Sequence, residues 1–84
     1  MMDRQKILKK ILGGSKNIRF VDMVHLVRGF GFELSRTEGS HHIFFRPDIP
    51  ELVNLQNVRG QAKIYQIRQF LKLVERHDLK LEDE

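Results

Sequence analysis

The sequence predicts an α+β domain in which helices pack on one face of a small three-stranded antiparallel sheet, with an extra helix at the N-terminus. Three observations predict this architecture. Apolar residues recur at three- and four-residue spacing in three segments, which is typical of helices with one buried face. Between the second and third segments, runs of β-branched and aromatic residues are separated by turn residues, which is typical of short strands. The order is helix, helix, hairpin, strand, helix.

The first predicted helix lies near the N-terminus and is basic. Its apolar residues stand at positions 7, 8, 11 and 12, and Gly13 and Gly14 follow them. Glycine is costly inside a helix, so the helix ends there. Residues 1–20 hold six basic groups and one acid, so an electrostatic arm for nucleic acid is an alternative. The helical spacing favours a packing helix, and we expect residues 1–17 to form that amphipathic helix and a Gly-rich linker.

The second helix leads into a predicted hairpin. Apolar residues recur at helical spacing over residues 20–30, where a Gly-Phe-Gly sequence ends the helix. Residues 32–36 alternate apolar and polar side chains, as a half-buried strand does. Residues 37–40 form a turn, and residues 41–46 are rich in the residue types that favour strands.

A third strand and the longest helix complete the domain. Residues 47–50 contain two prolines, which cannot continue a central strand, so the third strand is expected at residues 52–56. A break at residues 58–60 precedes a helix whose apolar side chains span residues 64–74. Its other side carries three cations at four-residue spacing, which are Arg68, Lys72 and Arg76. A solvated helix face and a phosphate-binding stripe both explain them.

Composition excludes several classes of protein. The chain has 84 residues and no cysteine, which leaves room for one small domain and excludes disulfides, zinc fingers and thiol nucleophiles. No apolar run approaches the roughly 18 residues that span a bilayer, and no continuous apolar segment of a secretory signal is present. The sequence also lacks a phosphate-binding glycine loop and an HExxH motif. We therefore expect a cytoplasmic protein with no metal site and no small-molecule cofactor.

The charge is unevenly distributed along the chain. The formal net charge is +4, which suits a polyanionic partner such as nucleic acid. Residues 21–76 hold eight basic groups and six acids, whereas residues 77–84 hold one basic group and four acids. We expect residues 80–84 to be a solvated acidic tail. Most of the positive charge therefore lies outside the segment that carries the candidate chemistry.

Two adjacent histidines are the main candidates for chemistry. His41 and His42 follow the Gly39-Ser40 turn at the start of a strand, whereas His25 and His77 lie on helices and are expected to be structural or surface residues. Successive strand residues point to opposite faces, so only one of the pair can serve a given site. The strand is apolar in both registers, so the pattern leaves open which histidine faces solvent.

Three segments of the chain resemble the HicA family of small bacterial toxins, which are ribonucleases of type II toxin–antitoxin systems. The first is Gly39-Ser40-His41-His42-Ile43-Phe44, placed after a strand that follows a glycine-flanked helix end. The others are Asn54-Leu55-Gln56, and Gly60-Gln61-Ala62-Lys63 leading into Tyr65-Gln66-Ile67-Arg68-Gln69-Phe70. The resemblance covers roughly residues 18–79. Residues 1–17 are additional to the shortest family members. Ile64 stands where the resemblance leads us to expect proline, and without proline the start of the helix is less sharply defined.

The resemblance implies a fold, an activity and partners. It implies a fold like that of double-stranded-RNA-binding domains, residues 18–79 as the RNA-binding ribonuclease domain, and His41 as the residue on which cleavage of mRNA depends. It also implies a HicB-type antitoxin as protein partner. We expect His41 to act as general acid or base and Lys63, Arg68 and Arg46 to stabilise the phosphate. An unpaired base would stack on Tyr65, on His42, or on whichever of Phe44 and Phe45 is exposed. The predicted RNA-binding residues are Gly39, Ser40, His42, Arg46, Lys63, Tyr65 and Arg68. A non-catalytic RNA-binding module and a protein-interaction domain are the alternatives.

Overall fold

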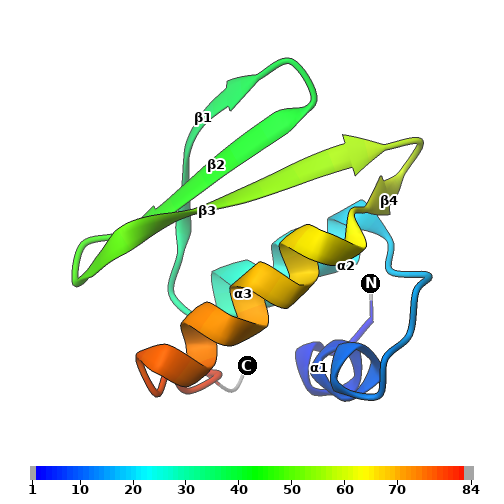
Figure 1. The fold of residues 1–84 in the computed structure, drawn as a ribbon, viewed down its shortest axis with the longest axis horizontal. Helices are drawn as coiled ribbons and strands as arrows, with labels where there is room; N and C mark the ends of the chain where they lie inside the picture. The colour runs from blue at the N-terminus through cyan, green and yellow to red at the C-terminus, as the bar shows by residue number, and fades with distance from the viewer. Residues whose placement is uncertain (1, 83–84) are drawn as a thin grey trace.

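The computed structural model describes residues 2–82 and contains three helices and four strands within them. The elements in chain order are α1 (Arg4–Leu12), α2 (Phe20–Gly29), β1 (Glu33–Glu38), β2 (His41–Arg46), β3 (Ile49–Val58), β4 (Gln61–Ala62) and α3 (Ile64–Arg76). The strands form one layer and the helices lie together on one side of it (Figure 1). The α+β class and the one-sided arrangement are therefore confirmed, and both are compatible with a fold like that of double-stranded-RNA-binding domains.

The sheet has four antiparallel strands in the order β1-β2-β3-β4, so the prediction of three strands is wrong by one. The extra strand, β4, is two residues long and pairs only with Asn57 and Val58. It follows a two-residue turn at Arg59 and Gly60, whose φ angles are 54° and 83°. Positive φ at both central residues is the conformation of the tightest hairpins. The segment predicted as a break is thus a hairpin turn.

Strand β3 is longer than predicted because it includes Ile49 and Pro50 as well as the expected residues 52–56. Proline is tolerated there because β4 reaches only the far end of β3, so the missing N–H of Pro50 removes no bond to β4. Pairing with β2 is irregular in the same region, where the register shifts between Phe44 and Arg46.

The core lies between the sheet and the helices. Phe70 of α3 is 1% exposed, and its ring meets those of Phe30 and Phe32 edge to face, at centroid distances of 5.4 and 5.8 Å. From β2 and β3, Phe44, Val53 and Leu55 are buried in the same cluster. Alternate residues of these strands therefore face the helices, and the residues between them face away.

Helix α1 and the C-terminal segment close the far side of the helical layer. Ile7 and Ile11 of α1 are buried in the core, so this helix packs as its spacing predicts, although Leu12 is exposed. After α3, Leu81 packs partly against the core, and the backbone N–H of Glu82 donates to the carbonyl of Gly29 at 3.0 Å. The start of the segment predicted as a solvated tail is thus in contact with the domain, and residues 83–84 lie outside the described residues.

An ion pair joins the start of β3 to the end of α3. The guanidinium of Arg76 lies 2.6 Å from one carboxylate oxygen of Glu51, and Nε2 of His77 lies 2.9 Å from the other. The Arg76 hydrogen bond, together with that of His77, lowers the pKa of Glu51 below its ordinary value. A carboxyl group with a lowered pKa stabilises the fold above its unfolded pKa, and this contribution is lost as the pH falls.

We therefore expect Glu51→Gln to flatten the acid limb of the stability profile. In wild type, the free energy of unfolding falls as pH drops through about 4.3, the ordinary glutamate pKa, and further below it. In the variant this fall is shallower, because one carboxylate that prefers the folded state has been removed. Urea unfolding at several pH values between about 3 and 6 measures both slopes. Glu33→Gln, on the exposed strand β1, is the control, and equal slopes in wild type and Glu51→Gln would contradict the prediction.

Candidate functional site

The candidate site lies at the hairpin between β1 and β2. Gly39 and Ser40 form a two-residue turn in which Gly39 has a φ of 60°, a conformation that favours glycine. The Ser40 carbonyl accepts a hydrogen bond from the N–H of Asn57 at 3.0 Å, which ties the turn to β3. His41 begins β2 directly after the turn and lies opposite Gln56 of β3. The turn and the strand pairing therefore fix the backbone position of His41.

The two histidines lie on opposite faces of the sheet. His42 lies opposite Leu55, which is fully buried against the helices. Its ring packs on Phe20 of α2 with centroids 4.7 Å apart, and its Nδ1 lies 3.3 Å from the Ser40 carbonyl oxygen. His41 therefore faces away from the helices. The question that the apolar pattern left open is settled by the register of β2 against β3.

Asn54 holds the His41 ring. Nδ1 of His41 lies 3.2 Å from Oδ1 of Asn54, on the neighbouring strand and the same face. An amide oxygen only accepts hydrogen bonds, so with the Asn54 amide in this orientation Nδ1 carries the proton. In the neutral ring the other nitrogen, Nε2, is then the unprotonated one. His41 is thus half-buried, oriented, and supplied with a basic nitrogen on the face that no helix covers.

The start of α3 is bonded to the strand beside His41. Gln66, which is 2% exposed, accepts a hydrogen bond from the N–H of Gln56 at 2.7 Å, and its amide nitrogen lies 3.4 Å from the hydroxyl of Tyr65. Tyr65 is 52% exposed, and the ammonium of Lys63 lies 5.5 Å from the centre of its ring. A cation and an exposed aromatic ring therefore stand at the same end of the sheet as His41.

Of the predicted RNA-binding residues, His42 lies on the opposite sheet face from His41, and Arg46 and Arg68 lie further along β2 and α3. Arg46 ends β2, five residues from His41, which is about 16 Å along a strand. Its guanidinium donates to the Phe30 carbonyl at 2.8 Å and pairs with Asp48 at 2.8 Å, so it ties the hairpin to the end of α2. Arg68 is exposed on α3, one turn beyond the Lys63–Tyr65 pair.

Asn54, Gln56 and Gln66 complete the site, and none of them was predicted as a site residue. Asn54 sets which nitrogen of His41 is protonated, and the hydrogen bond between Gln56 and Gln66 links β3 to α3. Asn54 and Gln56 are two residues apart in a strand, so alternation places them on one face. The pairing of that face with His41 depends on the strand register, which no residue pattern in the sequence indicates.

Across residues 2–82, no three His, Cys, Asp or Glu side chains gather as a metal site, and no helix is long and apolar enough to cross a membrane.

The fold and the site define a small α+β domain with a Gly-Ser-His turn at the sheet end that meets the start of the last helix. Residues 21–75 match the family model described as the HicA toxin of bacterial toxin–antitoxin systems. The match covers 55 of the 84 residues, and the chain belongs to the HicA toxin family. Comparison with curated proteins and with solved structures gave no match.

Replacing Asn54 by leucine is expected to lower the kcat of RNA cleavage, the activity proposed below, by about three- to tenfold, as losing one hydrogen bond does. The KM for RNA is expected to change little, because Asn54 acts through His41. Asn54→Asp restores the acceptor and moves the pH profile of kcat to more alkaline values, because a carboxylate favours the protonated ring. Steady-state kinetics across pH measure these effects. An unshifted profile in Asn54→Asp would show that Asn54 does not position His41.

Proposed function

We propose that this chain is the toxin of a toxin–antitoxin pair and cleaves mRNA as an endoribonuclease that depends on His41. The observation that carries the proposal is the His41–Asn54 contact, which orients an imidazole on the uncovered face of the sheet. Membership of the HicA family supports the class of activity. The protein acts in the cytoplasm, where its substrate is found.

The chemistry uses a nucleophile that RNA itself carries. The 2′-hydroxyl attacks the adjacent phosphorus, the bond from phosphorus to the 5′-oxygen breaks, and the products are a 2′,3′-cyclic phosphate and a 5′-hydroxyl. The step needs a base for the 2′-hydroxyl proton and an acid for the leaving oxygen. Nε2 of neutral His41 takes the first proton, and the protonated ring serves as an acid. This scheme requires no metal ion.

A cation and an aromatic ring at the same end of the sheet as His41 position the substrate. Lys63 offers positive charge to the phosphates, and the half-exposed ring of Tyr65 offers a stacking surface for an unpaired base. Arg68 is omitted because it lies one turn further along α3. Gly39 and Ser40 allow the RNA backbone to approach, because the turn carries only a hydrogen and a small side chain. Arg46 is omitted from the proposal because its guanidinium is already bonded to Phe30 and Asp48.

Purified protein, free of any partner, is the material for the test. In EDTA, it is expected to cut single-stranded or structured RNA and to leave 5′-hydroxyl ends. The alternative, a non-catalytic RNA-binding module of the same fold, predicts salt-sensitive binding with intact RNA. Gel analysis of end-labelled RNA separates the two outcomes, and binding without scission would refute the nuclease.

A HicB-type antitoxin is the protein partner that family membership supports. Co-expression with the frame adjacent to this gene is expected to yield a complex in which RNA cleavage is suppressed. If the complex forms but the separated chain has no nuclease activity, the chain is instead a protein-interaction domain.

A further inference from the structure

The outer edge of β3 is unpaired over most of its length. Strand β4 pairs only with Asn57 and Val58, at the far end. The next outward N–H, that of Gln56, is occupied by the side chain of Gln66 at 2.7 Å. Main-chain direction alternates along a regularly paired strand, so the N–H and carbonyl of Asn54 point out from the same edge as the N–H of Gln56. Within residues 2–82, the Asn54 amide donates to no other backbone carbonyl beyond the strand pairs.

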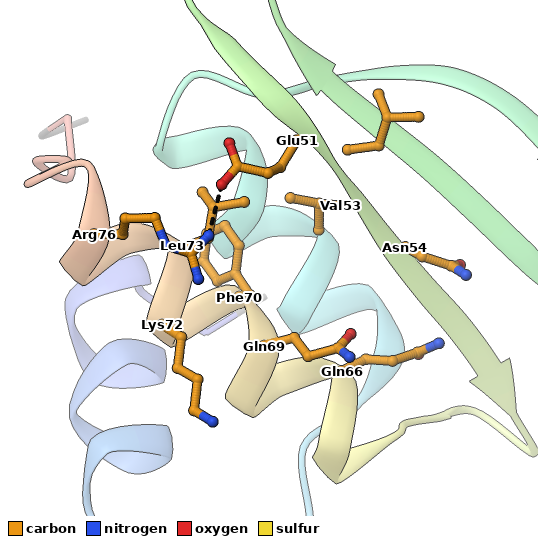
Figure 2. A pocket seen from close by; sticks show the side chains of 10 residues that line it. Glu51, Val53, Asn54, Gln66, Gln69, Phe70, Lys72, Leu73 and Arg76 are labelled. Carbon is orange, nitrogen blue, oxygen red and sulfur yellow. Dashed lines mark hydrogen bonds and ion pairs between the residues drawn. The ribbon is translucent and has the colours of Figure 1, made fainter.

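A groove runs beside this edge, between β3 and α3. Its volume is about 230 Å³. Figure 2 shows Val53 of β3 on one side and Phe70 and Leu73 of α3 on the other, with Gln69 toward the N-terminal end of the helix. The groove therefore combines unpaired main-chain donors and acceptors with an apolar floor. An extended peptide that adds to a sheet edge needs both, since its main chain pairs with the edge and alternate side chains fill the groove.

The charged side chains of the groove favour an acidic occupant. Lys72 and Arg76 line the helix side, and Glu51 is the single acid among the lining residues. Glu51 is already held by Arg76 and His77, whereas Lys72 forms no ion pair anywhere in residues 2–82. A second copy of this chain would bring the same cations together across the paired edges, which disfavours self-association.

We infer that the open edge of β3, from Glu51 to Leu55, binds an extended acidic segment of a partner protein as an added strand. The apolar floor favours this partner over RNA, whose phosphate backbone is bound chiefly by cationic and hydrogen-bonding groups. This site does not depend on RNA cleavage, because it uses the main chain of β3 and the side of α3.

Amide hydrogen exchange tests the site directly. The probe is a capped decapeptide of alternating valine and glutamate, added to the full-length protein. Binding is expected to slow exchange of the Asn54 amide by at least about tenfold at saturation, because it becomes a strand hydrogen bond. The same peptide with N-methyl groups on alternate residues of the pairing edge, and a valine–lysine peptide, are expected to give no protection.

Lys72→Glu is the matched variant, and Lys10→Glu on α1 is its control, because both lysines are exposed on helices. The first is expected to weaken peptide affinity by about three- to tenfold, and the second to change it little. The inference is overturned if the acidic peptide fails to protect Asn54, if it protects the α2 side of the sheet instead, or if the N-methylated peptide binds equally well. Protection of the same amide by an RNA oligonucleotide and not by peptide assigns the edge to RNA and also overturns it. Sedimentation of the free protein completes the set, and a dimer that protects this amide assigns the edge to self-association.

Discussion

His41→Ala is expected to lower the rate of RNA cleavage by about 10²- to 10⁴-fold, which is the usual contribution of a positioned general acid or base. The reason is that His41 is the only histidine placed by the described residues on the uncovered sheet face beside Asn54. The fold is expected to persist, because the variant loses one solvent-exposed hydrogen bond, worth about 1 kcal/mol at most. Initial rates on a labelled RNA, with urea unfolding of the same samples, measure both quantities.

His77→Ala is the control for this variant. His77 follows α3 and contacts Glu51, at the other end of the groove from the Gly39-Ser40 turn, so its loss is expected to leave cleavage within about twofold. Equal cleavage by His41→Ala and wild type would remove His41 from the mechanism. Circular dichroism of the His41→Ala protein shows whether it is folded. If it is unfolded, cleavage by the milder variant His41→Gln is measured instead, and wild-type activity in that variant would remove His41 from the mechanism.

Phe70→Ala is expected to be the most destabilising single substitution, with a loss of about 3–5 kcal/mol in the free energy of unfolding. The ring is buried between Phe30 and Phe32, so truncation removes two edge-to-face contacts and leaves a cavity where α3 meets the end of α2. A domain of this size has about 5–15 kcal/mol in total, so the variant is expected to be partly unfolded near 37 °C. Urea unfolding monitored by circular dichroism gives the value.

Phe45→Ala is the matched control, since Phe45 lies on β2 but outside the core cluster and is only half-buried. Its loss is expected to be well under half that of Phe70→Ala. Equal losses would mean that the helices and the sheet do not share the core described here.

The helices were the most predictable part of the fold. In α3, Ile67 and Phe70 fall at helical spacing and are buried as expected, so the helical period identifies the element. Its most buried face also includes Gln66 and Leu73, which were not among the expected core positions. Strand β2 was predicted with its observed bounds, His41 to Arg46, because Gly39-Ser40 precedes it and Pro47 follows it. In each case the information is local: turn residues and side-chain period act over a few positions.

Features that depend on pairing between distant residues were not predictable. The two-residue strand β4 is too short to have a period and exists because Arg59 and Gly60 return the chain onto β3. The register of β2 against β3 shifts near Arg46, so counting residues outward from the loop between these strands gives the wrong cross-strand partners. The His41–Asn54 contact depends on that register, and so does the face that His41 occupies. The family resemblance indicated His41 as a site residue, whereas its hydrogen-bond partner Asn54 could be identified only from the structure.

Cleavage of a matched pair of RNAs tests the central claim most directly. One RNA carries 2′-hydroxyl groups and the other has the same sequence with every 2′-oxygen methylated, and both are incubated in EDTA with wild type and with His41→Ala. Scission is expected only for the 2′-hydroxyl RNA with wild type, and the products are expected to end in 2′,3′-cyclic phosphate. Cleavage of the methylated RNA, or cleavage by His41→Ala at the wild-type rate, would contradict a mechanism in which His41 activates the 2′-hydroxyl of the substrate.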